Sequence, residues 1–522
     1  MASDSSLSIV ASRASAGLGA PPVRVEVHLA AGLPAFALVG LPEAAVRESR
    51  ERVRAAILTS GLHFPPGRIT VNLSPADLPK EGGRFDLPIA VGILAASGQV
   101  PAGATAGREF LGELSLSGAL RATPRILPAL VAAAAANQEV VLPAANAVEA
   151  AFVGDARLRL AASLREVHAA LCGLSALPAA AGAAAAAAEP PDPAPDLADV
   201  RGQFAARRAL ELAAAGGHGL LLVGPPGAGK TMLAQRLPGL LPPLDAREAL
   251  EVACLRSAAA LHPRPTRTPP FRSPQHTASV SALIGGPMRP GELSLAHRGV
   301  LFLDELPEFA RNALEALREP LESGVVCIGR ARSSVEYPAR FQLVAAMNPC
   351  PCGYAGDVHG RCRCTAGEVA RYRARLSGPL VDRIDMHVEL VALAVGDVFG
   401  EAAAMVESTA TVAARVAAAR ALQWRRQGCL NARLQPAAMR THCELGPGSR
   451  VLLGEAMRRL GLSARACHRV LKVARTAADL AGAVNIRDEH LAEALALRLL
   501  DRGTYDPARS PGDADHFTND TM

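Results

Sequence analysis

The chain has 522 residues, a formal net charge of +6 and a hydrophobic fraction of 50%. A chain of this length is too long to fold around a single hydrophobic core, which predicts about three domains. The mild positive charge permits nucleic-acid binding without requiring it. The sequence contains no apolar run long enough to span a membrane and does not begin like a signal peptide, so we expect a cytoplasmic protein with no membrane partner.

Residues 1–175 are predicted to form an N-terminal domain that mixes helices and strands. Alternation of polar and apolar residues predicts strands at 23–29 and 69–73, and helical segments are expected at 43–60 and 87–96. At 176–198 the composition changes to alanine and proline without apolar periodicity, which predicts a linker.

A glycine-rich motif follows the apolar run at 219–223 and precedes a helical stretch at 232–241. It comprises Gly224, Pro225, Pro226, Gly227, Ala228, Gly229, Lys230 and Thr231. The spacing G-x-x-x-x-G-K-[ST] is typical of a loop that holds the phosphates of ATP at a helix N-terminus. There, Lys230 would reach the β- and γ-phosphates and Thr231 would bind Mg²⁺. The alternative is a simple glycine turn after a core strand.

Two later apolar runs also end in polar side chains. Asp304 and Glu305 follow the run at 300–303, and Asn348 ends a strand-like run that starts at residue 341. Parallel strands bring such ends to one edge of a sheet, where ligands bind. We expect Asp304 to hold Mg²⁺, Glu305 to polarise the attacking water and Asn348 to orient it. For the two acids the alternative is a helix cap.

Four of the ten cysteines form two C-x-C pairs, Cys350 with Cys352 and Cys362 with Cys364. Four thiolates on so short a loop can surround Zn²⁺ tetrahedrally, so we predict a structural zinc. Free thiols and a disulfide are the alternatives.

The remainder of the chain is predicted to form helices and a loose tail. Helices are expected at 401–426, 449–460, 463–481 and 488–500, with Ser463 as an N-cap. We therefore predict a nucleotide-binding core at 199–400, a helical lid at 401–502 and a disordered tail at 503–522.

These motifs resemble AAA+ ATPases, and in particular the magnesium-chelatase-like family often called YifB or ComM. The segments that carry the resemblance are 32–42, 72–86, 297–307, 346–354 and 376–385. It covers nearly the whole chain except the linker and the tail. The resemblance implies an α/β fold, with an AAA+ P-loop parallel-sheet core and a helical lid. It also implies ATP and Mg²⁺ as cofactors and a homo-oligomeric ring, expected to be a hexamer.

The resemblance also implies roles for two arginines. Arg383 would be the finger that reaches the ATP of a neighbouring subunit, and Arg465 would be the sensor in the lid, with Arg469 one turn away as the alternative sensor. A salt bridge with Asp382 or Asp385 is the alternative role for Arg383.

The N-terminal part resembles the α+β, ribosomal-S5-like proteolytic domain of Lon, through the segments at 79–88 and 112–121. Lon-type proteolysis requires a serine in the first motif and a lysine after the second. Asp86 stands near the serine position and no lysine occurs between 81 and 229, so we expect a catalytically inactive domain.

Two inserts could place arginines in the channel of a ring. The insert at 270–293 carries Arg289, and a predicted β-hairpin at 326–340 carries Arg330, Arg332 and Arg340. Such arginines could follow a DNA backbone, or they could be solvated loop charges.

The predicted function is therefore a ring ATPase that acts on DNA, as a helicase or branch-migration motor for recombination intermediates in DNA uptake or repair. The alternatives are a motor for Mg²⁺ insertion into a porphyrin and an ATPase that remodels proteins.

Overall fold

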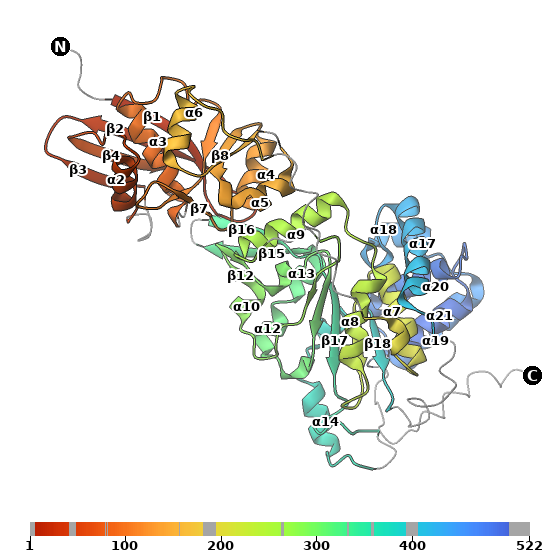
Figure 1. Ribbon diagram of the computed structural model, residues 1–522. Helices are drawn as coiled ribbons and strands as arrows, with labels where there is room; N and C mark the ends of the chain where they lie inside the picture. The colour runs from red at the N-terminus through yellow and green to blue at the C-terminus, as the bar shows by residue number, and fades with distance from the viewer. Residues whose placement is uncertain are drawn as a thin grey trace, which may run out of the picture.

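The computed structural model describes residues 6–40, 48–78, 80, 82–155, 157–180, 195–262, 266–330, 333–356, 360–392, 406–498 and 500. The chain forms an N-terminal domain, then a core built on a second sheet, and then a lid of helices (Figure 1). None of the helices described here is long and apolar enough to traverse a lipid bilayer.

The N-terminal domain is built on a sheet of seven strands in the order β3-β4-β2-β1-β5-β8-β9. Its strands are β1 (Ser6–Arg13), β2 (Pro22–Ala30), β3 (Ala35–Val39), β4 (Arg68–Ser74), β5 (Arg108–Phe110), β8 (Glu139–Pro143) and β9 (Leu158–Ala161). The pairs β1–β2 and β2–β4 are antiparallel and the other four pairs are parallel. The strands predicted at 23–29 and 69–73 are β2 and β4.

Five helices and a short strand pair complete this domain. They are α2 (Ser49–Thr59), α3 (Asp86–Ala96), α4 (Leu127–Ala135), α5 (Ala147–Val153), α6 (Leu164–Leu171) and the pair β6 (Glu113–Leu114) and β7 (Leu120–Arg121). The helix predicted at 87–96 is α3. The helix predicted at 43–60 is described from residue 49, because 41–47 lie outside the described residues.

The carboxylate of Asp86 ties α2 to α3 inside this domain. It is fully buried and accepts hydrogen bonds from Arg52 Nε (2.7 Å), the Leu114 backbone N–H (3.2 Å) and the Ser49 hydroxyl. Burial raises the pKa of Asp86, against the effect of the Arg52 and Ser49 hydrogen bonds. The residue near the expected serine position therefore takes part in a buried ion pair.

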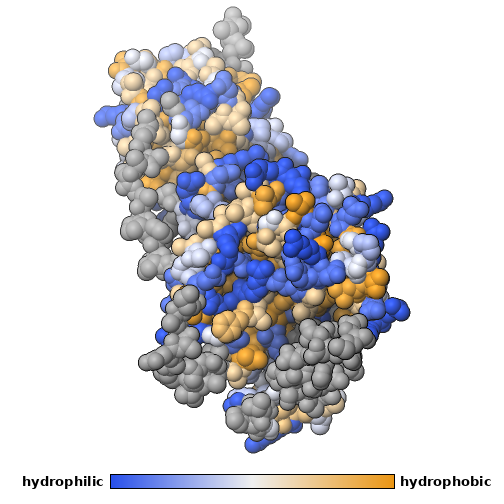
Figure 2. Space-filling model, turned by 90° about the vertical axis from the view of Figure 1, so that its right-hand side faces the viewer, coloured by the Kyte–Doolittle hydropathy of each residue, from blue (hydrophilic) through white to orange (hydrophobic). Residues whose placement is uncertain are grey.

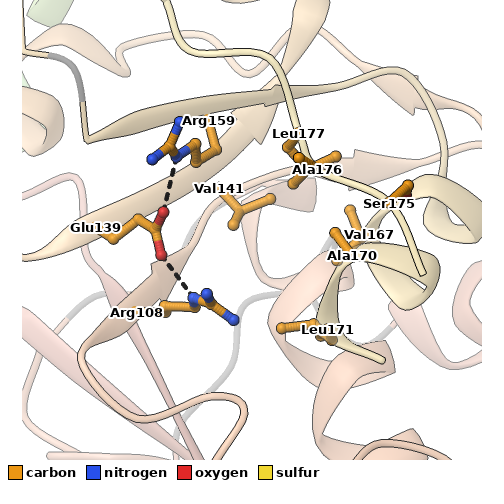
Figure 3. A pocket seen from close by; sticks show the side chains of 10 residues that line it. All are labelled: Arg108, Glu139, Val141, Arg159, Val167, Ala170, Leu171, Ser175, Ala176 and Leu177. Carbon is orange, nitrogen blue, oxygen red and sulfur yellow. Dashed lines mark hydrogen bonds and ion pairs between the residues drawn. The ribbon is translucent and has the colours of Figure 1, made fainter. Parts of the chain in front are cut away.

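A cavity of about 240 Å³ lies in the same domain, between β5, β8 and β9 on one side and α6 on the other (Figure 3). At its edge Glu139 accepts hydrogen bonds from Arg108 (2.6 Å) and Arg159 (2.7 Å). Residues 175–177 line the cavity, and residues 178–180 then hydrogen-bond to β9. The start of the segment predicted as a linker, 176–198, thus packs on the N-terminal sheet, and 181–194 lie outside the described residues.

The core contains a parallel sheet of five strands in the order β11-β14-β17-β10-β18. The strands are β10 (Leu220–Val223), β11 (Phe271–Arg272), β14 (Val300–Leu303), β17 (Gln342–Met347) and β18 (Met386–Glu389). Every residue of β10, β14 and β17 is buried, which explains why these strands read as continuous apolar runs in the sequence. The predicted α/β class with a parallel sheet is confirmed.

Helices and two small hairpins surround this sheet. The helices are α7 (Phe204–Gly216), α8 (Lys230–Leu240), α9 (Ala246–Ala258), α10 (Val280–Ile284), α11 (Glu292–Leu295), α12 (Arg311–Glu315), α13 (Arg318–Ser323), α14 (Ala366–Arg373) and α15 (Gly378–Val381). One hairpin, β12 (Gly285–Gly286) with β13 (Arg289–Pro290), separates α10 from α11. The other, β15 (Val325–Arg330) with β16 (Ser333–Pro338), precedes β17.

The lid consists of α17 (Thr409–Gln427), α18 (Pro436–His442), α19 (Pro447–Leu460), α20 (Ala464–Leu480) and α21 (Asp488–Ala496). The Ser463 hydroxyl accepts a hydrogen bond from the backbone of Ala466 (3.1 Å), as expected of an N-cap. The short helix α18 was not predicted, because seven residues are too few for a clear helical period. Residues 401–405 and the predicted tail at 503–522 lie outside the described residues.

Among the described residues, the N-terminal domain contacts the core at α9 and at the hairpin β15–β16. At α9, Leu127 packs with Ala253 and Cys254, and its backbone N–H donates to the Ser257 hydroxyl (3.3 Å). At the hairpin, the turn after β1 packs against β16, since a Cβ placed on Gly17 would lie 3.0 Å from Cγ1 of Val335. Figure 1 shows β15 and β16 between the two parts.

Candidate nucleotide-binding site

The predicted phosphate loop connects β10 to α8 at the C-terminal end of the parallel sheet. Gly227 and Gly229 have φ values of +78° and +89°, which residues with a side chain rarely adopt. A Cβ on Gly224 would lie 2.8 Å from the carbonyl oxygen of Leu390. The glycines are therefore required by the turn itself, which brings the backbone N–H groups of the loop and the first turn of α8 together.

Lys230 bridges the phosphate loop and the end of β17. Its Nζ donates to the carbonyl oxygens of Gly224 (2.6 Å) and Pro225 (3.0 Å) and to Oδ1 of Asn348 (3.0 Å). Partial burial lowers the pKa of Lys230, against the field of Asp304 and Glu305. The structure thus brings Asn348, the polar residue that follows β17, into contact with the lysine of the phosphate loop.

The two residues expected to bind Mg²⁺ also meet. The Thr231 hydroxyl donates to Oδ2 of Asp304 (2.9 Å), across the gap between α8 and the end of β14. A hydroxyl and a carboxylate oxygen are hard ligands of the kind that Mg²⁺ prefers. This pair of donors therefore fits the ion that accompanies ATP.

Glu305 follows Asp304 in a left-handed backbone conformation. Its φ is +52°, and its backbone N–H donates to Oδ1 of Asp304 (2.9 Å). Its carboxylate faces Nδ1 of His276 at 3.1 Å. We did not predict His276 from the sequence. The only signal was its place four residues after β11, at the same sheet edge.

Arg383 lies just before β18 and contacts a residue of its own chain. Its Nη2 is 2.7 Å from Oε1 of Glu322, and its Nη1 donates to the carbonyl oxygen of Pro379 (2.8 Å). Asp385, one of the two partners considered from the sequence, is engaged elsewhere. Glu322 was not considered, because nothing in the local sequence links it to Arg383.

The buried carboxylate of Asp385 joins the core to the lid. It contacts the guanidinium of Arg469 on α20 and Nδ1 of His218 (3.3 Å), and His218 also contacts the Thr476 hydroxyl (2.7 Å). Burial alone would raise the pKa of Asp385, but Arg469 and His218 outweigh it and hold the pKa well below its usual range. Arg469 is thus occupied, whereas Arg465 is exposed on the first turn of α20.

The four paired cysteines lie together after β17. Their sulfur atoms all lie within 4.8 Å of one another, and three of the separations are 3.3 Å (Cys350–Cys352), 3.7 Å (Cys352–Cys362) and 3.8 Å (Cys350–Cys362). Four sulfur ligands placed tetrahedrally about 2.3 Å from Zn²⁺ would be about 3.8 Å apart. The spacing therefore fits a zinc ion.

The surroundings of the sulfur atoms also favour a cation. Burial raises the pKa of Cys352, but backbone N–H groups of Arg363 and Tyr354 outweigh it and bring the pKa to about 6. The pKa of Cys364 is raised to about 12, although a backbone hydrogen bond opposes this rise, because burial and its cysteine neighbours disfavour another thiolate. A divalent cation would relieve this repulsion.

Among the arginines predicted to face DNA, the described positions 289, 330 and 340 lie at different places in the fold. Arg330 ends β15 at the turn of the hairpin, where its side chain is not described, and Arg332 lies outside the described residues. Arg340 lies beyond the other end of the hairpin, about 17 Å of strand away from the turn. Arg289 is exposed on the separate hairpin β12–β13.

The base of the hairpin β15–β16 is fixed by His297. The Nδ1 of His297 accepts the backbone N–H of Arg340 (2.9 Å), and its Nε2 lies 3.2 Å from Glu251. Because a backbone N–H can only donate, Nδ1 carries no proton and the ring is neutral. Burial lowers the pKa of His297 to about 4, although the Glu251 hydrogen bond opposes this shift.

Comparison with known proteins places the chain in one family along most of its length. Residues 196–398 match the family model for magnesium chelatase, subunit ChlI, residues 25–146 match that for subunit ChlI of Mg-chelatase, and residues 406–498 match that for its C-terminal region.

Two relatives are similar over nearly their full length. YifB of Escherichia coli is 48% identical over 501 residues, covering 95% of this chain and 98% of the relative. The competence protein ComM of Haemophilus influenzae is 48% identical over 505 residues, with the same coverage. The magnesium-chelatase 67 kDa subunit of Heliobacterium mobile is more distant, at 31% identity over 227 residues, which are 37% of this chain and 30% of that subunit. The chain therefore belongs to the magnesium-chelatase-like AAA+ family that contains YifB and ComM.

Proposed function

We propose that the protein is a cytoplasmic ATP-hydrolysing ring motor that acts on DNA, as a helicase or branch-migration factor for recombination intermediates. The observation that carries the ATPase part is the meeting of Lys230, Thr231, Asp304, Glu305 and Asn348 at one edge of a parallel sheet. AAA+ membership supports ATP and Mg²⁺ as cofactors.

In this proposal each side chain has one task. The backbone N–H groups of the phosphate loop bind the β- and γ-phosphates, and Lys230 exchanges its carbonyl partners for phosphate oxygens. Thr231 and Asp304 hold Mg²⁺, which neutralises phosphate charge when bound. Glu305 accepts a proton from the attacking water, and Asn348 orients that water.

A ring accounts for the position of the two arginines. The guanidinium of Arg383 lies at an in-chain carboxylate, Glu322, whose side chain is 61% exposed, so a neighbouring subunit's phosphate could replace it. Arg465 is the better sensor candidate because Arg469 is held by Asp385.

The lid also exposes large apolar side chains that a neighbour could cover, among them Trp424, Val451 and Val484. On the face in Figure 2, hydrophobic areas alternate with hydrophilic ones.

Two observations support DNA as the substrate. The hairpin β15–β16 carries Arg330 at its turn, where a channel-lining loop would meet a phosphate backbone. A relative that covers nearly the whole chain is named a competence protein. The N-terminal domain is proposed to be an inactive, Lon-like module, since Asp86 is held by Arg52 and Ser49.

We further propose that Cys350, Cys352, Cys362 and Cys364 hold one structural Zn²⁺. Their sulfur spacing supports this cation. The alternatives of free thiols and a disulfide predict no bound metal. Metal analysis of the purified protein under reducing conditions separates these possibilities.

The test of the function is ATP hydrolysis with and without DNA. We expect forked or four-way DNA to accelerate hydrolysis and ATP to drive unwinding of the branch. A porphyrin-metallation motor remains the second candidate because the matching family models are named for magnesium chelatase. No response to any DNA would contradict the DNA proposal and leave the ATPase proposal intact.

A further inference from the structure

The segment that carries the first cysteine pair also contacts the phosphate loop at both of its ends. At one end, Asn348 accepts a hydrogen bond from Lys230 (3.0 Å). At the other end, Gly353 packs on Pro226, since a Cβ on Gly353 would lie 2.7 Å from Cδ of that proline. Cys350 and Cys352 lie between these two contacts. Any group that fixes the two cysteines therefore fixes both contacts.

The two contacts depend on the local conformation of residues 350–355. Gly353 has a φ of +85°, and its backbone N–H donates to the carbonyl oxygen of Cys350 (3.0 Å). The sulfur of Cys350 is buried and accepts the backbone N–H of Ala355 (3.2 Å). These bonds close a turn around the sulfur atom. The segment of the second cysteine pair contacts this turn through the sulfur atoms of Cys362 and Cys364, and also through the Arg361 guanidinium over the Tyr354 ring (4.5 Å to the centroid).

We propose that the metal held by these four cysteines is a working part of the ATP site, because it positions Asn348 and Gly353 against the phosphate loop. This inference rests on the proposed zinc site. When zinc leaves, the turn loses its cross-link to the second cysteine pair and the loop loses two supports. Nucleotide affinity falls as a result. By linkage, bound nucleotide raises the affinity for zinc by the same factor.

Gly353→Ala tests the contact without removing a metal ligand. The added Cβ collides with Pro226, so we expect zinc to stay at one ion per chain while the affinity for a fluorescent ADP analogue falls by about tenfold. Gly360→Ala is the matched control. Gly360 has a φ of +65° in the same loop, but a Cβ there meets no atom within 4 Å.

The reciprocal measurement follows zinc release. An excess of a colorimetric zinc chelator is added to the full-length reduced protein, with and without the ADP analogue, and the transfer of zinc to the chelator is followed over time. We expect nucleotide to slow the release of zinc in the wild type and in Gly360→Ala, and to have much less effect in Gly353→Ala. Re-adding zinc to the stripped, reduced protein is expected to restore nucleotide affinity.

The outcomes separate the inference from the zinc proposal. One zinc per chain, with Gly353→Ala binding nucleotide as tightly as Gly360→Ala, would overturn the coupling and leave the zinc site intact. No zinc in the reduced wild type would overturn both. Equal weakening in the two alanine variants would also overturn the coupling, because it would trace the effect to backbone strain alone.

Discussion

Single side chains at the sheet edge divide the binding of ATP from its hydrolysis. Lys230 contacts the loop that would hold the phosphates, whereas the carboxylate of Glu305 faces His276. In the proposed reaction the two residues act at different stages, so substitutions at each should impair different steps.

We expect Lys230→Ala to weaken ATP binding and Glu305→Gln to preserve binding while stopping turnover, because the amide cannot accept a proton from water. Equilibrium binding of a fluorescent ATP analogue and steady-state phosphate release measure the two effects. Normal turnover by Glu305→Gln would show that another group acts as the base.

The two lid arginines differ in what holds them. Arg469→Ala leaves the buried carboxylate of Asp385 without its guanidinium partner, so we expect the free energy of unfolding to fall by about 3 kcal/mol or more. Arg465→Ala removes an exposed side chain, and we expect unchanged stability with slower hydrolysis. Denaturant unfolding and ATPase assays on both variants check this assignment. Slow hydrolysis with full stability in Arg469→Ala would exchange the two roles.

At the scale of elements, the two ends of the hairpin β15–β16 have different surroundings. The turn carries Arg330, and the base is fixed by the neutral ring of His297 through the backbone of Arg340. The turn can thus contact a substrate while the base stays attached to the core. Substitutions at the turn should affect substrate binding, and substitutions at the base should affect stability.

The base of the hairpin should be sensitive to acid. The pKa of His297 is about 4 in the folded protein and about 6.5 when unfolded, so its contribution is complete above pH 6.5 and is lost as the pH falls toward 4. Between pH 7.5 and 5 we expect a loss of about 2 kcal/mol from this residue. His297→Gln should reduce the pH dependence of unfolding by that amount. An unchanged pH dependence would refute the neutral-ring assignment.

The turn of the hairpin should determine DNA affinity. Replacing Arg330 and Arg332 by alanine is expected to weaken DNA binding and to flatten its salt dependence by about one unit of slope for each phosphate that the protein no longer neutralises. Basal ATP hydrolysis should persist. Arg340→Ala, at the opposite end of the hairpin, is the control and should leave the salt slope unchanged. Equal affinities in wild type and the double variant would favour solvated loop charges.

The sequence predicts elements better than contacts between them. The strands β10, β14 and β17 are continuous apolar runs, and the polar residues after them necessarily meet at one sheet edge. The partners of Glu305 and Arg383, which are His276 and Glu322, come from distant segments. No spacing rule links such pairs, because they depend on loop conformation and helix placement.

For the whole molecule, the proposed ring makes the ATP site a property of two subunits. Arg383 has only Glu322 and the carbonyl oxygen of Pro379 as partners among the described contacts of a single chain. Its proposed role therefore requires a second subunit, and the dependence can be tested by mixing variants.

We expect Arg383→Ala to assemble and to bind ATP but to hydrolyse it about 10³-fold more slowly or worse, as for other arginine fingers. Mixing it with Lys230→Ala should restore part of the activity, because an intact finger then meets an intact phosphate loop at some interfaces. Phosphate release measured across mixing ratios follows this recovery. Activity in the mixture no higher than the sum of the two variants would contradict a finger supplied in trans.

The contact between Gly17 and Val335 has a mechanical consequence. The turn after β1 already lies against β16, and a Cβ added at Gly17 would lie only 3.0 Å from Cγ1 of Val335. At this point the N-terminal domain therefore opposes movement of the hairpin toward it. Any movement of the hairpin toward the N-terminal domain would have to carry that domain with it, which couples the two parts in that direction.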